Sequence, residues 1–296
     1  MALARLVASL IAGPLLAAAV AVVAATPGRA EQVDLQLVLA IDVSGSVDPE
    51  EARLQRQGYI DAFADPRIIR AIRSGPKGRI AVSYFEWSDS VYQRLVVDWT
   101  IVSDEASAAA FAARLDKASI SIATRTSISG AVTYAMALLA RSPHESDRRV
   151  VDVSGDGPNN DGPFVDEARD LAVAGKITIN GLPIINDRPN RMGFPTMPDL
   201  DLYYQDCVIG GRGAFLVVAK DFDSFAAAIK QKLFLEIAGL APRVFARRAP
   251  ALGFDLPVVW APPPAGPVRK ARFDGDCQIG ERQSHEFWRF RQTYPD

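Results

Sequence analysis

Histidine and cysteine are scarce in this sequence, which has two residues of each among 296. Neither His144 nor His285 has the sequence context of a hydrolase triad beside an activated serine. The motifs G-x-S-x-G, G-x-x-x-x-G-K-[ST] and G-x-G-x-x-G are absent, and the glycine-rich stretch 210–213 lacks the third phosphate-binding glycine. These absences argue against a serine hydrolase, a P-loop nucleotide hydrolase and a dinucleotide-dependent oxidoreductase.

The chain also lacks an excess of positive charge. It has 33 Lys and Arg residues against 35 Asp and Glu, a formal net charge of -2 and a pI near 5.8. A protein that binds nucleic acid as its main partner needs a basic face for the phosphates. We therefore expect no nucleic acid partner, and we interpret Arg247-Arg248 and Arg289–Arg291 as solvated surface.

The N-terminus is typical of an export signal. Arg5 precedes an almost wholly apolar run from Leu6 to Ala25, and Gly28-Arg29-Ala30 places small residues where a signal peptidase cleaves. The run is long enough to span a bilayer, so an uncleaved anchor is the alternative, although Gly13-Pro14 interrupts the run and favours cleavage. We predict a signal peptide over 1–30 and a periplasmic or secreted protein, with membrane attachment only if this segment is retained.

The two cysteines are Cys207 and Cys277, and no C-x-x-C motif is present to suggest zinc or redox chemistry. In an oxidising compartment such a pair tends to form a disulfide, which here would tie the C-terminal segment to the main domain. Loop-closure entropy gives such a bridge about 4 kcal/mol of stabilisation. Two buried thiols are the alternative.

Predicted strands and helices alternate along most of the chain. This alternation predicts an α/β fold with a doubly wound, mostly parallel sheet, helices on both faces and right-handed crossovers. A short link between the second and third strands adds one antiparallel edge strand. The predicted strands cover 35–42, 79–86, 92–97, 150–153, 177–185 and 213–218, and the predicted helices cover 49–63, 67–73, 106–117, 127–139, 164–174 and 222–235.

The first strand ends on a cluster of oxygen-bearing side chains, in the sequence LQLVLAIDVSGSVD. Asp42, Ser44 and Ser46 lie two residues apart, so an extended turn directs all three at one point. One carboxylate and two hydroxyls are oxygen ligands of the kind that hard divalent cations prefer. A buried strand followed by an ordinary Ser/Gly turn is the alternative interpretation. Asp48 comes next, before Pro49, and this pattern predicts a helix N-cap instead of a further ligand.

Two later segments supply partners for this cluster. Thr126 precedes a helix with small residues at its start, and Asp156-Gly157 follows the apolar strand RRVVDVS. In this order the segments resemble the metal-ion-dependent adhesion site of von Willebrand factor A (VWA) domains. In doubly wound sheets ligands bind beyond the carboxyl ends of strands where the strand order reverses, which is where Asp42 and Asp156 are expected to meet.

The resemblance implies a binding module and not an enzyme. It implies Mg²⁺ or Mn²⁺ held directly by Ser44, Ser46 and Thr126 and largely through water by Asp42 and Asp156. One open position would then take a carboxylate from a protein partner. The family often has two glycines before the threonine, whereas this chain has Thr124-Arg125. Arg125 either steers an acidic ligand or is a solvated loop residue.

As a whole the sequence resembles exported bacterial proteins of uncharacterised function with a single VWA domain (DUF1194-like). This resemblance implies a VWA domain over 31–240 and a Pro/Arg-rich C-terminal extension over 241–296 that docks through Cys277. The enzymatic alternative is a Mg²⁺-dependent phosphohydrolase that uses Asp42, Asp156 and Asp161. Two serine ligands and the lack of a second-metal or general-base cluster weigh against it.

Overall fold

The computed structural model describes residues 30–185, 197–220, 222–240, 258–259, 273 and 275–293. The predicted signal peptide, except Ala30, and most of the Pro/Arg-rich stretch lie outside these residues. Within the described part of the chain, no helix has both the length and the apolar character needed to cross a membrane.

A seven-stranded sheet forms the centre of the fold in the order β4-β3-β2-β6-β7-β8-β9. Its strands are β2 (Gln36–Asp42), β3 (Ile80–Trp87), β4 (Gln93–Val102), β6 (Arg149–Gly155), β7 (Thr178–Pro183), β8 (Leu216–Val217) and β9 (Val258–Val259). The neighbouring strands β3, β2, β6, β7 and β8 pair in parallel, in that order. The edge strand β4 pairs antiparallel with β3. The mostly parallel sheet with an antiparallel edge strand is thus confirmed. The short strand β9 adds a second antiparallel pairing at the opposite edge, which was not predicted.

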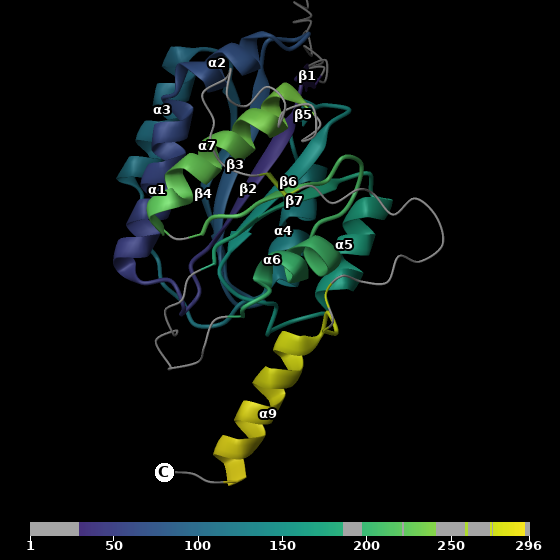
Figure 1. The fold of residues 1–296 in the computed structure, drawn as a ribbon. Helices are drawn as coiled ribbons and strands as arrows, with labels where there is room; N and C mark the ends of the chain where they lie inside the picture. The colour runs from purple at the N-terminus through teal and green to yellow at the C-terminus, as the bar shows by residue number, and fades with distance from the viewer. Residues whose placement is uncertain are drawn as a thin grey trace, which may run out of the picture. The chain divides into compact units, whose positions relative to one another are not determined.

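Helices cover both faces of this sheet (Figure 1). On one face lie α1 (Pro49–Phe63), α2 (Pro66–Arg73), α3 (Glu105–Lys117) and α7 (Phe222–Ala238). On the other lie α4 (Ile128–Ala140), α5 (Val165–Ala174), α6 (Leu200–Tyr203) and a π-helix, η1 (Tyr204–Val208). A separate two-stranded parallel sheet joins β1 (Glu31–Gln32) to β5 (His144–Glu145), and α9 (Ile279–Thr293) is the last helix described.

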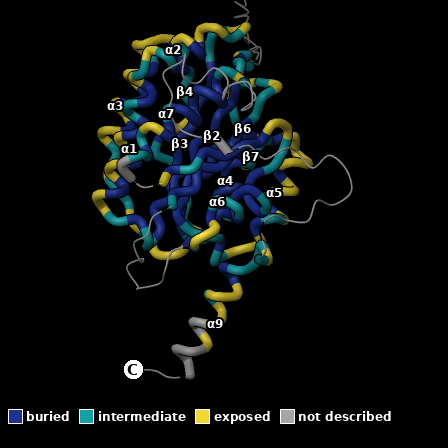
Figure 2. The backbone as a smooth tube through the Cα atoms, viewed as in Figure 1, coloured by how far each residue is buried: buried dark blue, intermediate teal, exposed yellow. Residues whose placement is uncertain are grey.

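The central strand β2 is apolar on both faces because helices cover both. Leu37, Leu39 and Ile41 pack in the core beneath α1 and α7, whereas Val38 and Ala40 pack beneath α4 and α5. Figure 2 shows the sheet as the most buried part of the backbone. Such a continuous apolar run is expected of a parallel strand buried on both sides, and it fixes β2 and its polar C-terminal end in the middle of the sheet.

The start of α1 is set by the predicted N-cap. The Asp48 carboxylate accepts hydrogen bonds from the backbone N–H groups of Glu50 and Glu51, and the Glu51 side chain accepts one from the Asp48 N–H. This capping box satisfies backbone donors that the first helical turn leaves without partners. The prediction that Asp48 caps a helix is confirmed.

Several elements of the second half differ from the prediction, and α6 and β9 are among those not predicted. The strand predicted over 213–218 is only Leu216–Val217, because Gly211 and Gly213 adopt positive φ angles in the turn before it. Neither η1 nor α9 was predicted. The sequence of α9 is mostly polar and has no long apolar run. The sequence alone therefore does not indicate which of its residues pack against the domain.

A buried ionic network fastens α7 to the sheet. Lys232 is fully buried and forms ion pairs with Asp152 of β6 and with Glu236 one helical turn further on, where Nζ and Oε1 lie 2.6 Å apart. The Asn180 side chain on β7 donates to Glu236 Oε1 at 2.9 Å. Burial raises the pKa of Glu236 to about 7; the negative charge of Asp152 adds to this rise, and Lys232 opposes it.

This network predicts a specific pH dependence of stability. A glutamate whose pKa is raised in the folded state stabilises that state fully below its unfolded pKa, and this contribution is lost as pH rises through about 7. Relative to Glu236→Gln, the wild type should therefore lose up to about 3 kcal/mol of unfolding free energy between pH 5 and pH 8. Urea unfolding of both proteins with chelator present measures the difference, and a constant difference across that range would contradict the assignment.

Candidate metal centre

The candidate site lies at the carboxyl ends of two adjacent strands. Asp42 is the last residue of β2, and Asp156 directly follows β6. The two strands pair in parallel up to Ile41 and Ser154. Because β3 and β6 lie on opposite sides of β2, this is the point where the strand order reverses, as the sequence predicts.

A chain of hydrogen bonds links four of the predicted ligands. The Ser44 N–H donates to Asp42 Oδ1 at 2.7 Å, and the Ser44 and Ser46 hydroxyl oxygens lie 3.1 Å apart. The Ser46 hydroxyl donates to Asp156 Oδ1 at 2.5 Å. The structure therefore brings Asp42, Ser44, Ser46 and Asp156 into one polar cluster.

The fifth predicted ligand, Thr126, comes from the loop before α4. Its backbone is held by two hydrogen bonds, from the Thr126 N–H to Asn160 Oδ1 at 2.9 Å and from the Asn160 N–H to the Thr126 carbonyl at 2.8 Å. Its hydroxyl faces the turn after Asp156, because a Cβ added at Gly157 would lie 3.9 Å from Thr126 Oγ1. All five predicted ligands thus belong to three loops that meet at the carboxyl end of the sheet.

The site contains two buried carboxylates whose negative charge is not balanced. Asp42 and Asp156 are 0% and 3% exposed, and one oxygen of each has no hydrogen-bond partner in the described part of the chain. Burial raises the pKa of Asp42 well above its usual value, and the charge of Asp156 adds to this. Burial likewise raises the pKa of Asp156 to about 6; Glu51 adds to the rise and the Ser46 hydroxyl opposes it.

Close backbone approach shapes the floor of the site. A Cβ added at Gly155 would lie 2.9 Å from Asp42 Oδ2 and 2.7 Å from the Tyr204 hydroxyl. A side chain at this position would displace one of the two groups, so glycine is required here. The hydroxyl of Tyr204, from η1, therefore lies beside Gly155, as does the oxygen of Asp42 that lacks a hydrogen-bond partner.

The donor set fits a hard divalent cation. It combines two carboxylates with unpaired oxygens and three hydroxyls, and oxygen ligands of this kind suit Mg²⁺ and Mn²⁺. Among the described residues, no group of three or more His, Cys, Asp or Glu side chains lies close enough to hold a metal. The candidate site depends instead on the hydroxyls of serine and threonine.

Asp161 and Arg125 lie beside this cluster and are paired with each other. Arg125 Nη1 contacts Asp161 Oδ1 at 2.7 Å, and the Ser90 N–H donates to Asp161 Oδ2 at 2.8 Å. Burial acts to raise the pKa of Asp161, but the hydrogen bonds from Ser90 and Arg125 outweigh it, and the pKa is lowered. Both oxygens of Asp161 thus have partners, in contrast to those of Asp42 and Asp156.

Several residues that support the site were missed by the sequence analysis. Asn159 and Asn160 hold the segment around Thr126 by hydrogen bonds. Tyr204 lies near Asp42, and the negative charge of Glu51 raises the pKa of Asp156. The only sequence signal was the pair of asparagines shortly after Asp156-Gly157, since amide side chains often bind backbone groups in loops. Nothing local indicates the roles of Tyr204 or Glu51.

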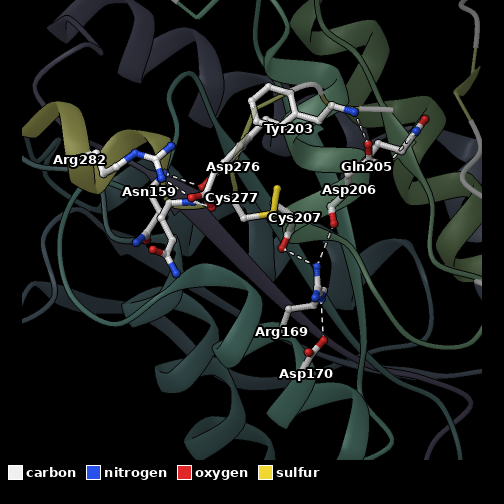
Figure 3. The surroundings of a disulfide bond; sticks show 12 residues. Asn159, Arg169, Asp170, Tyr203, Gln205, Asp206, Cys207, Asp276, Cys277 and Arg282 are labelled. Atoms are coloured by element: carbon white, nitrogen blue, oxygen red, sulfur yellow. Dashed lines mark hydrogen bonds and ion pairs between the residues drawn. A yellow bond between two sulfur atoms is a disulfide. The ribbon is translucent and has the colours of Figure 1, made fainter. Parts of the chain in front are cut away.

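The structure joins Cys207 of η1 to Cys277, just before α9, by a disulfide with a Cα–Cα distance of 5.5 Å (Figure 3). The bridge closes a loop of 70 residues and brings the C-terminal segment to the same side of the sheet as α5 and α6.

The fold and the comparisons agree on the class of protein. A doubly wound sheet with an antiparallel edge strand, and a polar cluster at the ends of β2 and β6, define a VWA-type domain. Within this class the chain belongs to the family described as "Protein of unknown function (DUF1194)", which matches residues 32–241. No curated protein matches the chain.

Two solved structures with TM-scores of 0.50 share this fold at low sequence identity, and others are similar at lower scores. Proximal thread matrix protein 1 from the mussel byssus has 16% identity and a TM-score of 0.50 over 70% of this chain and 47% of its own. The pilus adhesin SpaC from Lactobacillus rhamnosus GG has 11% identity and a TM-score of 0.50 over 69% and 30%. A von Willebrand factor type A protein from Catenulispora acidiphila has 14% identity and a TM-score of 0.47 over 69% and 43%. This chain therefore spans less than half of each of these proteins.

Another structure of the mussel protein contains a zinc-occupied MIDAS motif; it has 16% identity and a TM-score of 0.49 over 69% of this chain and 46% of that chain. At these identities the likeness concerns the fold alone.

The unbalanced carboxylates predict opposite effects of one substitution on metal binding and on stability. Asp42→Asn keeps an oxygen that can accept from the Ser44 N–H but removes a buried negative charge. The affinity for Mn²⁺ should fall by about tenfold to a hundredfold, while the melting temperature of the metal-free protein should stay equal or rise. Calorimetry and thermal unfolding, with the exposed Asp116→Asn as control, measure both quantities. Unchanged affinity for Mn²⁺ would exclude Asp42 from the site.

Proposed function

We propose that this protein is a metal-dependent binding module that captures an acidic group of a protein partner. The observation that carries this proposal is the pair of buried carboxylates, Asp42 and Asp156. Each has one oxygen without a hydrogen-bond partner in the described structure, and three hydroxyls lie beside them at the carboxyl end of the sheet. Charges buried in this way are normally paired or bind metal.

The types of the side chains suggest how the site divides its work. Ser44, Ser46 and Thr126 would hold Mg²⁺ or Mn²⁺ directly, and Asp42 and Asp156 would act largely through water. Because the direct protein ligands are neutral hydroxyls, a bound cation would retain much of its attraction for an anionic oxygen at an open coordination position. A carboxylate from a partner protein supplies such an oxygen.

The alternative function, phosphate ester hydrolysis, has less support. That reaction needs a general base or a second metal near the first carboxylates. Asp161, the third carboxylate considered for it, is held by Arg125 and Ser90. Neither histidine belongs to the cluster of predicted ligands, so we propose binding without catalysis.

We further propose that binding takes place outside the cytoplasm. The apolar N-terminal run with its small-residue cleavage pattern supports export, and the Cys207–Cys277 bridge is of the kind that persists in oxidising compartments. The pairing of Arg125 with Asp161 leaves a partly exposed guanidinium at the rim, which is compatible with steering an acidic ligand.

Thr126→Ala tests the proposed function because it removes one hydroxyl ligand while the backbone hydrogen bonds to Asn160 remain. Immobilised wild type should capture a protein from bacterial envelope extract in Mg²⁺ and release it in chelator, and Thr126→Ala should capture none. The circular dichroism spectrum and melting temperature should be nearly unchanged. Thr133→Ala, which alters an exposed threonine on α4, is the matched control.

The same preparations separate binding from catalysis. Wild type incubated with p-nitrophenyl phosphate and Mg²⁺ should release no phosphate above background. Turnover by the wild type that disappears in Asp156→Ala would replace the proposed binding function with phosphate ester hydrolysis.

A further inference from the structure

The C-terminal segment contacts a loop that also holds the candidate metal centre. That loop follows β6 and runs from Asp156 to Asp161, and its central residue, Asn159, is fully buried. Asn159 Nδ2 donates to Glu281 Oε1 of α9 at 2.7 Å, across 122 residues of sequence. Glu281 is itself 7% exposed. A side chain of the tail therefore completes the hydrogen bonding of a loop in the main domain.

Asn159 links this contact to two other elements. Its Oδ1 accepts from the Ser129 N–H in the first turn of α4 at 3.0 Å, and its backbone N–H donates to the Tyr203 hydroxyl at 3.1 Å. The amide thus bridges α9 and the helix that begins just after Thr126, and a shift of Asn159 would be felt at that end of α4.

The next residue carries the connection to a predicted ligand. Asn160 holds the backbone of Thr126 by the two hydrogen bonds described above, at 2.9 Å and 2.8 Å. Since Asn159 and Asn160 are consecutive, the position of the first constrains the second. The physical path from the tail to the metal centre is therefore Glu281, Asn159, Asn160 and Thr126.

The packing of the tail on this loop is close. A Cβ added at Gly280 would overlap the Asn159 carbonyl oxygen and would lie 2.9 Å from its carbon. Only glycine permits this approach of the two backbones. The first turn of α9 is therefore seated directly on the loop, and Glu281 reaches Asn159 from that position.

The Cys207–Cys277 disulfide and the contacts around it hold the start of α9 against this loop (Figure 3). Beside the Cys207–Cys277 bridge, the Phe273 N–H donates to Asp206 Oδ2 at 2.6 Å, and the Phe273 ring packs edge-on against Tyr203 at 5.7 Å between centroids. Arg169 of α5 donates to the carbonyl of Cys207 at 3.0 Å, which fastens η1 in turn.

Burial of Glu281 has a free-energy cost that the covalent link helps to offset. One Glu281 oxygen has no hydrogen-bond partner in the described residues, so burying this carboxylate costs free energy that the single bond to Asn159 only partly offsets. The bridge lowers the entropic cost of bringing the tail to the loop, and the N-terminal turn of α9 favours a negative charge.

From these contacts we propose that the segment from Gly275 to Glu281 acts as part of the metal centre. Glu281 is a positioning residue: held by the Cys207–Cys277 bridge, it fixes Asn159 and thereby the loop that presents Thr126. The affinity of the centre for its cation then depends on the tail. This inference rests on the proposed function, because it assumes that the five oxygen ligands bind a metal.

The test compares Mn²⁺ affinities of the full mature chain by calorimetry. Glu281→Ala, which removes the acceptor, should weaken binding about tenfold, at the low end for residues that orient metal ligands. Glu281→Gln keeps an oxygen that can accept from Asn159 and should recover most of that loss. Glu286→Gln, at an exposed position on the same helix, should bind like the wild type.

The bridge is tested in the same assay. The double variant Cys207→Ser, Cys277→Ser should lose a similar factor in Mn²⁺ affinity, and adding Glu281→Ala to it should change little further, since both act through Asn159. If the double variant does not fold, the comparison of Glu281→Ala with Glu281→Gln still decides. Equal Mn²⁺ affinity in wild type and Glu281→Ala would overturn the positioning role.

The outcomes for the two proposals are distinct. A wild type with its disulfide intact that binds no Mn²⁺ would contradict the metal-dependent function itself. A wild type that binds Mn²⁺ and Glu281 and cysteine variants that bind it equally well would leave the metal centre standing and refute only the contribution of the tail. Equal loss in Glu281→Ala and Glu281→Gln would also count against positioning through Asn159.

Discussion

The burial of two carboxylates at the ends of neighbouring strands is the constraint on which the site depends. Asp42 and Asp156 are buried because they lie at the carboxyl ends of β2 and β6, which are adjacent in the centre of the sheet. Desolvated negative charges this close together raise each other's free energy. The hydroxyls of Ser44 and Ser46 and the close approach at Gly155 are all arranged around this charge.

A second buried ionic cluster in the same domain shows the contrast. On the opposite face of the sheet, Asp152 and Glu236 share Lys232, so the protein supplies the positive charge from its own sequence. Asp156, four residues further along the same strand and loop, has no such partner in the described structure. The Lys232 cluster contains its own positive charge and links α7 to the sheet. The cluster of Asp42 and Asp156 has no such counter-charge in the described structure, which is why we propose it as the site for a cation.

The order of strands and helices followed from local sequence pattern. Periodicity, the Asp48 capping box and the apolar run of β2 act over a few residues, so the helices from α1 to α5 and α7 and the central parallel strands were predicted close to their observed bounds. The short elements β1, β5, α6 and β9, the π-helix and α9 were missed. Their sequences carry weak local preferences, and their structures depend on tertiary partners such as β8 and the Cys207–Cys277 bridge.

The same division holds within the site. The sequence by itself determined which oxygen-bearing residues end β2 and follow β6, because their two-residue spacing and their place after apolar strands are local facts. Only the tertiary structure decided which distant residues support them: Tyr204 and Glu281 are brought to the loops by crossovers and by a disulfide. No spacing rule connects residues more than a hundred positions apart, since their proximity is set by the packing of the whole domain.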